Sequence, residues 1–229
     1  MSTLIAIETS TESCSAALLR DGRLIERSEL APRRHAELIL PMIEAVLEEA
    51  GVSRRQLDAV AVGRGPGAFT GVRLGVSVAQ GLALGLDIPV VPVSSLAALA
   101  QDASAHAGET ILALIDARMG EIYAGSFRRG SGGLVEAISE ETVGLASELV
   151  LPRAGCIVGS GWIAYADVLA ARLPAAPRIV DGARYPQARA IALLAATRFA
   201  AGHGVAPEQA LPVYLRDKVA LTLKEQRAR

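Results

Sequence analysis

The stretch Gly63-Arg64-Gly65-Pro66-Gly67-Ala68-Phe69-Thr70-Gly71 decides the fold, because it joins a buried strand to a helix. Residues 57–62 before it are apolar apart from one Asp and predict a buried strand. Residues 72–86 after it lack proline and are rich in Ala, Leu and Val, which predicts a helix. Glycines in such a turn allow a close backbone approach, and the N–H groups that open a helix attract anions. Three interpretations stay open: a phosphate or nucleotide cradle, a tight contact with another backbone, or a plain strand-to-helix turn.

The composition is that of a globular α/β protein. The chain has 229 residues, 51% of them hydrophobic and 21% charged, which is enough for one large domain or two small lobes. Aromatic residues make up only 3%, so the core must consist of Ala, Leu, Val and Ile, which suits helices packed on parallel strands. A net charge of −1 gives no global field that would attract nucleic acid or a membrane.

The cysteines and the apolar segments indicate a reducing, aqueous environment. Cys14 and Cys156 lie far apart without metal-site spacing, and we expect both to be buried, reduced thiols. The N-terminus has no basic region, and Glu8 interrupts its apolar run, so no signal peptide is expected. The longest apolar stretches, such as residues 190–196, are too short to span a bilayer. We therefore expect a soluble, cytoplasmic protein that does not enter a membrane.

The order of predicted elements repeats once along the chain. In the first half we expect strands over residues 4–7, 14–19, 24–30, 57–62 and 89–93, and helices over 35–50, 72–86 and 96–103. After a hinge rich in Ala, Ser and Gly, we expect strands over 111–115, 121–128, 134–143, 156–158 and 179–180, and helices over 162–173 and 187–201. No residue-level repeat accompanies this pattern.

Two β-β-β-α-β-α units of this kind are the plan of the actin, heat-shock chaperone and sugar-kinase superfamily, known as the ASKHA fold. The predicted fold class is therefore α/β with two actin-like lobes. We expect residues 1–103 to form the first lobe and residues 104–207 to form a second, smaller and more divergent lobe. The C-terminal segment, about 208–229, is expected to return to the first lobe.

The central run and several further segments resemble the TsaB (YeaZ) family of bacterial tRNA-modification proteins. The resemblance is specific from residue 4 to about residue 99 and looser beyond. The segments that carry it are Gly65-Pro66-Gly67-Ala68-Phe69-Thr70-Gly71-Val72-Arg73, Ile7-Glu8-Thr9-Ser10, His35-Ala36-Glu37-Leu38-Ile39-Leu40-Pro41-Met42-Ile43, Gly81-Leu82-Ala83, Val93-Ser94-Ser95-Leu96-Ala97-Ala98-Leu99 and Pro212-Val213-Tyr214-Leu215-Arg216.

The resemblance implies a function as well as an actin-like fold. Members of the family are non-catalytic partners of a paralogue, TsaD, which transfers threonylcarbamoyl from an adenylate to N6 of an adenosine. That adenosine lies in the anticodon loop of tRNAs that read codons beginning with A. The resemblance further implies pairing with TsaD through the first lobe, docking of a small TsaE-like ATPase at the seam, a homodimer in the absence of the partner, and tRNA contact only within the complex.

The residues themselves argue against independent catalysis. The catalytic paralogue carries a His-x-x-x-His pair that can share one metal, because positions i and i+4 of a helix face the same way. The corresponding positions here are Ser95 and Leu99, and the only histidines, His35, His106 and His203, lack ligand spacing. We therefore predict no catalytic residue and no metal site.

An ATP-dependent phosphotransferase of the same superfamily is the alternative function. Glu8, Thr9 and Ser10 after the first strand and Asp116 at a strand end of the second lobe could face each other across a cleft. The opposing interpretation is that Glu8, Thr9 and Ser10 satisfy their own turn. Gly159-Ser160-Gly161 is the only candidate for an adenosine-binding loop. No cofactor is expected on this chain alone, and ATP or ADP is a candidate ligand at the seam of the complex. The candidate phosphate or nucleotide residues are Glu8, Thr9, Ser10, Gly65, Gly67 and Thr70.

The helix after the central loop carries a row of small residues. Gly71, Gly75 and Ala79 lie at i, i+4 and i+8, so another helix or strand can approach this side closely. Packing on the protein's own sheet and packing on a partner are both open, and the resemblance favours the partner. A plain dimeric binding module is a third function. The basic tail, residues 216–229, either contacts RNA or a partner or is a frayed terminus. The predicted partner-interface residues are His35, Ile39, Gly71, Arg73, Gly75, Val78, Ala79 and Leu82.

Overall fold

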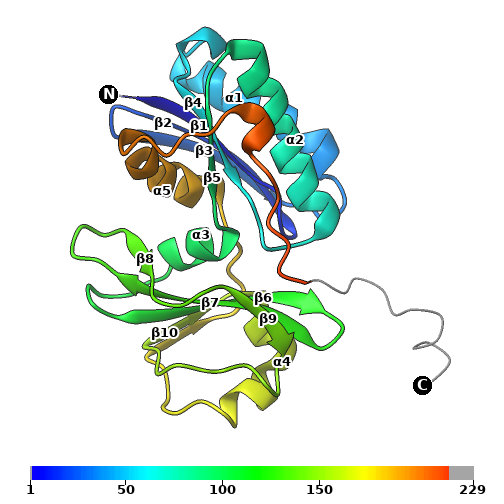
Figure 1. Cartoon of the computed structure of the whole chain (residues 1–229), viewed down its shortest axis with the longest axis vertical. Helices are drawn as coiled ribbons and strands as arrows, with labels where there is room; N and C mark the ends of the chain where they lie inside the picture. Colours follow the sequence, from blue (N-terminus) through cyan, green and yellow to red (C-terminus); the bar gives the residue numbers. More distant parts are fainter. Residues whose placement is uncertain (1, 217–229) are drawn as a thin grey trace, which may run out of the picture.

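A computed structural model describes residues 2–216, which form two lobes, each built on one mixed β-sheet (Figure 1). The first sheet has the strand order β3-β2-β1-β4-β5. Strands β1, β2 and β3 pair in antiparallel fashion, whereas β4 runs parallel to β1 and β5 parallel to β4. Its strands are β1 (Thr3–Glu8), β2 (Ser13–Arg20), β3 (Arg23–Leu30), β4 (Ala59–Gly63) and β5 (Val90–Val93).

The burial of these strands follows their sequences. Every residue of β1 and β4 is buried, because both strands are apolar along most of their length and lie in the middle of the sheet with both faces covered. Strand β3, with Arg23, Glu26 and Arg27 among its side chains, is mostly exposed and forms the edge.

The second sheet repeats the arrangement of the first. Its order is β11-β10-β6-β7-β8, and β9 also pairs with β7. The sequence predicts one strand over 134–143, but the structure has two: β8 pairs with the end of β7, and β9 pairs with its beginning. The strands are β6 (Thr110–Arg118), β7 (Glu121–Arg129), β8 (Val135–Ala137), β9 (Thr142–Leu145), β10 (Cys156–Val158) and β11 (Ile179–Asp181).

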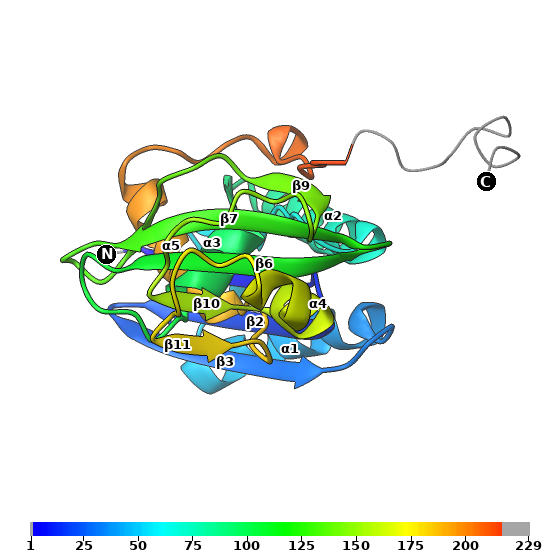
Figure 2. The same ribbon diagram turned by 90° about the horizontal axis from the view of Figure 1, so that it is seen from below.

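Helices and sheets alternate in five layers (Figure 1). Helices α1 (His35–Ala50) and α2 (Phe69–Leu86) cover the outer face of the first sheet, and α2 begins three residues before the predicted start. Helix α4 (Ser160–Ala170) covers the outer face of the second sheet, as the view from below shows (Figure 2). Helices α3 (Ser95–Gln101) and α5 (Ala188–Ala200) lie between the sheets and contribute to one apolar core that both lobes share.

The last helix of each lobe packs on the sheet of the other lobe. Helix α3 contacts β6 and β7, and α5 contacts β1, β2 and β4. Helix α5 follows the second sheet in the chain but packs on the first, because its buried Ala and Ile side chains fit the inner face of that sheet.

The chain then stays with the first lobe. Val205 forms a β-bridge with Val90, a short helical turn follows at η2 (Pro207–Gln209), and the N–H of Val213 donates to the carbonyl of Arg64 over 2.9 Å. The described part of the C-terminal segment therefore lies on the first lobe from Val205 onward, which is earlier than residue 208. The part of the basic tail beyond Arg216 lies outside the described residues.

Candidate functional site

The glycine-rich loop packs against the turn between β1 and β2. A Cβ on Gly67 would lie 2.3 Å from the carbonyl oxygen of Ser10, and one on Gly71 would lie 2.1 Å from that of Thr9. The N–H of Ala68 donates to the Ser10 carbonyl over 2.7 Å. Of the three interpretations of this loop, the geometry supports a tight contact with another backbone, and that backbone belongs to the same chain.

The row of small residues on α2 continues the same internal contact. A Cβ on Gly75 would lie 2.6 Å from the hydroxyl oxygen of Thr9, and that hydroxyl donates to the carbonyl of Gly71 over 2.7 Å. Gly75, Ala79 and Ile39 are buried within the chain. Their prediction as partner-interface residues is therefore wrong, because a partner cannot reach them in this structure.

The outward side of α1 and α2 is nevertheless apolar. Leu84 is 73% exposed and Leu40 is 52% exposed. Among the described residues, α2 alone has the length and hydropathy of a membrane span, which is weak evidence because core helices of soluble proteins share these properties, and only 28% of that span is buried. We call the exposed side of these helices the α1–α2 face, and it includes Leu40, Arg73, Val78, Leu82 and Leu84.

The sequence prediction missed Leu40 and Leu84. Both are leucines outside the buried stripe of an amphipathic helix, and that departure from the pattern was the available signal. The predicted residues Gly71, Val78 and Leu82 are half-buried. His35 is half-buried as well, with its Nε2 2.8 Å from the carbonyl oxygen of Thr11.

Arg73 joins the start of α2 to the C-terminal segment. Its guanidinium carbon lies 3.7 Å from the centre of the Phe69 ring, and its Nε donates to the hydroxyl of Tyr214 over 2.6 Å. The rings of Phe69 and Tyr214 are 5.7 Å apart and about half-exposed. This contact holds Tyr214 beside the first turn of α2.

Glu8 is fully buried, and its carboxylate contacts the turn after β1 and the start of helix α3. Its carboxylate accepts from the N–H of Ser10 over 2.6 Å and from the hydroxyl of Ser95 over 2.8 Å. Burial raises the pKa of Glu8, and these hydrogen bonds oppose the shift. The prediction that Glu8 and Asp116 face each other across a cleft is wrong, because Glu8 satisfies the turn that follows its own strand.

The two positions of the missing imidazole pair are filled by structural contacts. Ser95 donates to Glu8, and Leu99 is fully buried, where its methyl group lies 2.5 Å from the position that a Cβ on Gly159 would take. Within residues 2–216, no group of three or more His, Cys, Asp or Glu side chains is placed to hold a metal.

The second glycine turn, Gly159-Ser160-Gly161, also packs on its own lobe. Gly159 has a φ of +104°, and a Cβ there would lie 2.2 Å from the carbonyl oxygen of Leu114 in β6. The Ser160 hydroxyl accepts from the N–H of Asp116 over 3.1 Å. These contacts leave no open cradle at this turn for an adenosine.

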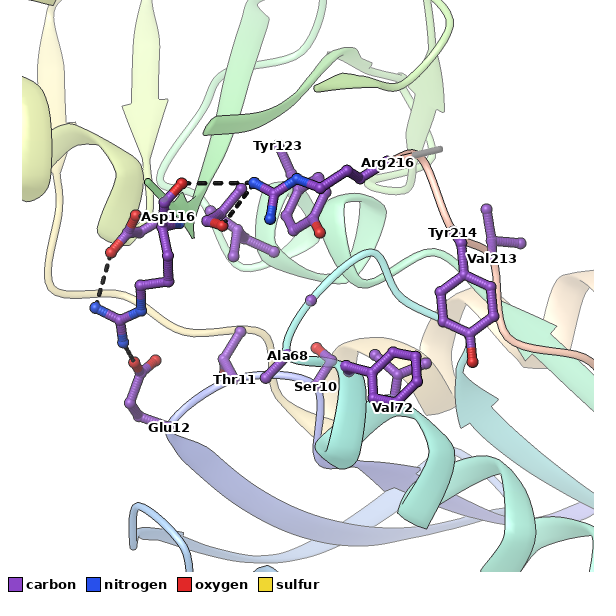
Figure 3. A pocket seen from close by; sticks show the side chains of 15 residues that line it. Ser10, Thr11, Glu12, Ala68, Val72, Asp116, Tyr123, Val213, Tyr214 and Arg216 are labelled. Carbon is purple, nitrogen blue, oxygen red and sulfur yellow. Dashed lines mark hydrogen bonds and ion pairs between the residues drawn. The ribbon is translucent and has the colours of Figure 1, made fainter. Parts of the chain in front are cut away.

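A cavity of about 230 Å³ lies between the lobes, and we call it the interlobe cavity (Figure 3). Arg118 bridges it: one nitrogen lies 2.6 Å from Glu12 of the first lobe, and another lies 2.9 Å from Asp116 of the second. Arg216 donates to the carbonyl of Ala117 and pairs with Glu121. The lining residues are Ser10, Thr11, Glu12, Gly67, Ala68, Phe69, Val72, Ile115, Asp116, Ala117, Arg118, Tyr123, Val213, Tyr214 and Arg216.

Comparison of the sequence with known proteins identifies relatives of this chain. The chain is 42% identical over 225 residues to the tRNA threonylcarbamoyladenosine biosynthesis protein TsaB of Escherichia coli K12, which covers 95% of this chain and 96% of that protein. It belongs to the TsaB family. TsaB of Haemophilus influenzae is 40% identical over 228 residues, with 95% of this chain and 94% of the relative covered.

A solved structure and a family model agree with this assignment. YeaZ from Pseudomonas aeruginosa superposes with a TM-score of 0.84 at 43% identity, over 94% of this chain and all of that one. The family model of TsaD, tRNA N6-adenosine threonylcarbamoyltransferase, matches residues 27–223. The predicted resemblance and the two-lobed α/β fold class are therefore confirmed.

Proposed function

We propose that this chain is the non-catalytic partner and activator of a TsaD-type transferase that forms N6-threonylcarbamoyladenosine in tRNA. The relatives named TsaB and the match to the TsaD family model support the pathway. The observation that carries the non-catalytic role is the packing of Ser95 and Leu99. The Ser95 hydroxyl donates a hydrogen bond to the buried carboxylate of Glu8, and Leu99 is a fully buried apolar side chain. Neither side chain therefore offers a ligand to a metal.

The α1–α2 face is the surface that we assign to the partner. Its exposed leucines give a partner helix apolar area to bury, and two adjacent helices offer ridges and grooves for packing. The same face would serve a homodimer in the absence of the partner. We further propose that a TsaE-like ATPase docks at the seam, that ATP or ADP binds only there, and that tRNA is contacted only within the assembled complex in the cytoplasm.

Reconstitution with a TsaD-type transferase, the TsaE-like ATPase, tRNA and the threonylcarbamoyl adenylate tests the proposal. Modification should require this chain, and Leu84→Glu should abolish both partner binding and modification, because it places a charge in an apolar contact. Val150→Glu is the matched control, since Val150 is 94% exposed in the second lobe and this variant should behave as the parent does.

Two results would refute the proposal. The first is full modification without this chain. The second is magnesium-dependent ATP turnover by the chain alone that Asp116→Ala abolishes, which is the behaviour of the alternative phosphotransferase. The burial of Glu8 removes the two-carboxylate arrangement on which that alternative depended.

A further inference from the structure

We propose that Glu141 of the second lobe is a positioning residue for the partner surface, because it holds the glycine-rich loop that opens α2. Glu141 directly precedes β9, and its side chain is 14% exposed. Its carboxylate reaches the first lobe, where it accepts from the hydroxyl of Ser94 and lies 3.4 Å from a guanidinium nitrogen of Arg64. The inference rests on the proposed function, since it gives the second lobe a part in forming the α1–α2 face.

The contact with Ser94 fixes the carboxylate of Glu141 at the start of a helix. Ser94 is the N-cap residue of α3, and its hydroxyl oxygen also accepts from the N–H of Ala97 over 3.1 Å. A negative charge is favourable at this end of a helix, where the peptide dipoles leave a partial positive charge. Glu141 is thus held by two groups of the first lobe, one on the glycine-rich loop and one on α3.

Arg64 belongs to the glycine-rich loop and joins it to two other segments. Its backbone N–H donates to the carbonyl of Val93 in β5 over 2.8 Å, and its carbonyl accepts from the N–H of Val213 over 2.9 Å. The carbonyl of Gly65, the next residue of the loop, accepts from the N–H of Ser95 over 2.9 Å. A displacement of Arg64 therefore moves the loop together with the end of β5 and the C-terminal segment.

The C-terminal segment extends this connection to the α1–α2 face. Tyr214 follows Val213, and its hydroxyl accepts from the Nε of Arg73, which belongs to that face. Chains of packed side chains and hydrogen bonds of this kind carry energetic coupling between distant parts of a protein. The contacts form an unbroken path from Glu141, through the loop and the C-terminal segment, to Arg73.

Close packing does not fix this part of the loop. A second cavity, of about 370 Å³, adjoins the contact, and Arg64, Ser94 and Glu141 line it together with side chains of β8 and α5. Side chains at a cavity wall lack packing partners on one side, so the polar contact holds Glu141 against the first lobe. The ion pair is also less exposed than the one between Glu12 and Arg118, so water and salt weaken it less.

The experiment compares amide hydrogen exchange in Glu141→Gln and in the parent full-length chain, read by mass spectrometry. Exchange of loop residues 64–69 should rise roughly tenfold in the variant, because the loss of a charge-assisted contact lets the loop open more often. Exchange in β6 and β7 should stay as in the parent, because the shared core is unchanged. Glu140→Gln is the matched control, since it removes the same charge from the adjacent, exposed position and should leave loop exchange unaltered.

Two further measurements separate a positioning role from a general effect on stability. Arg64→Gln should reproduce the faster loop exchange, and the double variant should exchange no faster than either single variant, because all of them break the same contact. With a TsaD-type transferase, Glu141→Gln should weaken binding roughly fivefold, whereas Glu140→Gln should bind as the parent does.

Unchanged loop exchange in Glu141→Gln, additive effects in the double variant, or faster exchange over the whole chain would overturn the inference. So would a Glu141→Gln variant that binds the transferase as tightly as the parent while Leu84→Glu does not bind, and in that case the proposed function would stand. A parent chain that binds no transferase would instead refute the proposed function. Loop exchange is measured without a transferase, so it would still decide whether Glu141 holds the loop.

Discussion

The two lobes have the same strand order but different outer layers. In each lobe an antiparallel meander is followed by two parallel strands, so β6, β7 and β8 correspond to β1, β2 and β3. The first sheet is covered by helices of 16 and 18 residues, whereas the second is covered by α4, which has 11 residues and a non-helical Tyr165 within it. Within residues 2–216, the same strand order thus carries two long outer helices in the first lobe, where we propose the partner surface, and one short, kinked outer helix in the second.

The inner layers show the opposite relationship, because there the lobes depend on each other. Helix α3 follows β5 of the first sheet and packs on the second, and α5 follows β11 of the second sheet and packs on the first. Side chains from both sheets meet these helices in a single core. Neither lobe buries its inner face alone, so we expect them to fold as one unit.

Removing a side chain of this shared core should have the largest effect. Ile191→Ala in α5 and Leu99→Ala in α3 should each lower the free energy of unfolding by about 2–5 kcal/mol in urea titration. Leu193→Ala is the control on the same helix, because Leu193 is exposed. Each variant should still unfold in one transition.

The two cysteines test whether the lobes open together. Burial raises the pKa of the Cys14 thiol to about 11 and also raises the pKa of Cys156, so neither thiol reacts while it stays buried. Cys14 lies in the first lobe and Cys156 in the second. If the lobes share one core, the labelling rates of Cys14 and Cys156 should rise together in Ile191→Ala relative to the parent. A rise at only one of the two cysteines would contradict the shared core.

The glycines of α2 should give effects of opposite sign along one helix. Gly71→Ala places a Cβ against the carbonyl of Thr9, which must shift at a cost of about 1–3 kcal/mol. Gly81→Ala meets nothing within 4 Å and should gain up to about 1 kcal/mol from helix propensity. Thermal and urea unfolding measure both. If Gly71→Ala were neutral, the row of small residues would have another purpose.

Much of the fold could be predicted because local sequence patterns mark its individual strands and helices. Apolar runs mark β1 and β4, and helix α1 has the predicted bounds of residues 35–50. The placement of α5 could not be predicted, because Ala and Leu occur on all sides of this helix. Its sequence therefore does not indicate which of the two sheets it packs against. The division of residues 134–143 into two strands depends on where β7 offers free edges, which is a property of the sheet and not of the segment.

The candidate site was less predictable than the fold. Residue type marked Ser10 as a candidate phosphate or nucleotide residue and the loop before α2 as unusual, and the structure places Ser10 at the wall of the interlobe cavity. Whether Gly71 approaches a ligand, a partner or its own chain depends on Thr9, sixty-two positions earlier, so sequence spacing leaves it open. The position of Arg216 at the interlobe cavity could not be predicted either, because only the tertiary structure brings this residue beside Ala117.

A pH titration should distinguish the buried carboxylate of the first lobe from ordinary surface acids. Because burial raises the pKa of Glu8, the folded state keeps its proton at pH values where the unfolded chain, with a pKa near 4.5, has lost it. The free energy of unfolding therefore falls as pH rises from about 4.5 to the folded pKa. Glu8→Gln has no carboxyl group to titrate at this position, so its free energy of unfolding should rise relative to that of the parent across this pH window. Urea unfolding at each pH measures the difference. A difference that stays constant with pH would show that Glu8 titrates normally.

The smallest effect should come from the ion pair that joins the lobes across the interlobe cavity. Glu12→Gln breaks the contact with Arg118, whose side chain is 71% exposed, and pairs of this kind contribute about 0–1 kcal/mol. We expect a change within this range, similar to that of Asp21→Asn, which removes a pair within the first lobe. Labelling of Cys14 and Cys156 should stay coupled, since the apolar layer of α3 and α5 holds the lobes together and the ion pair does not. If Glu12→Gln instead separated the two labelling rates, the charged bridge would be the element that unites two otherwise independent lobes.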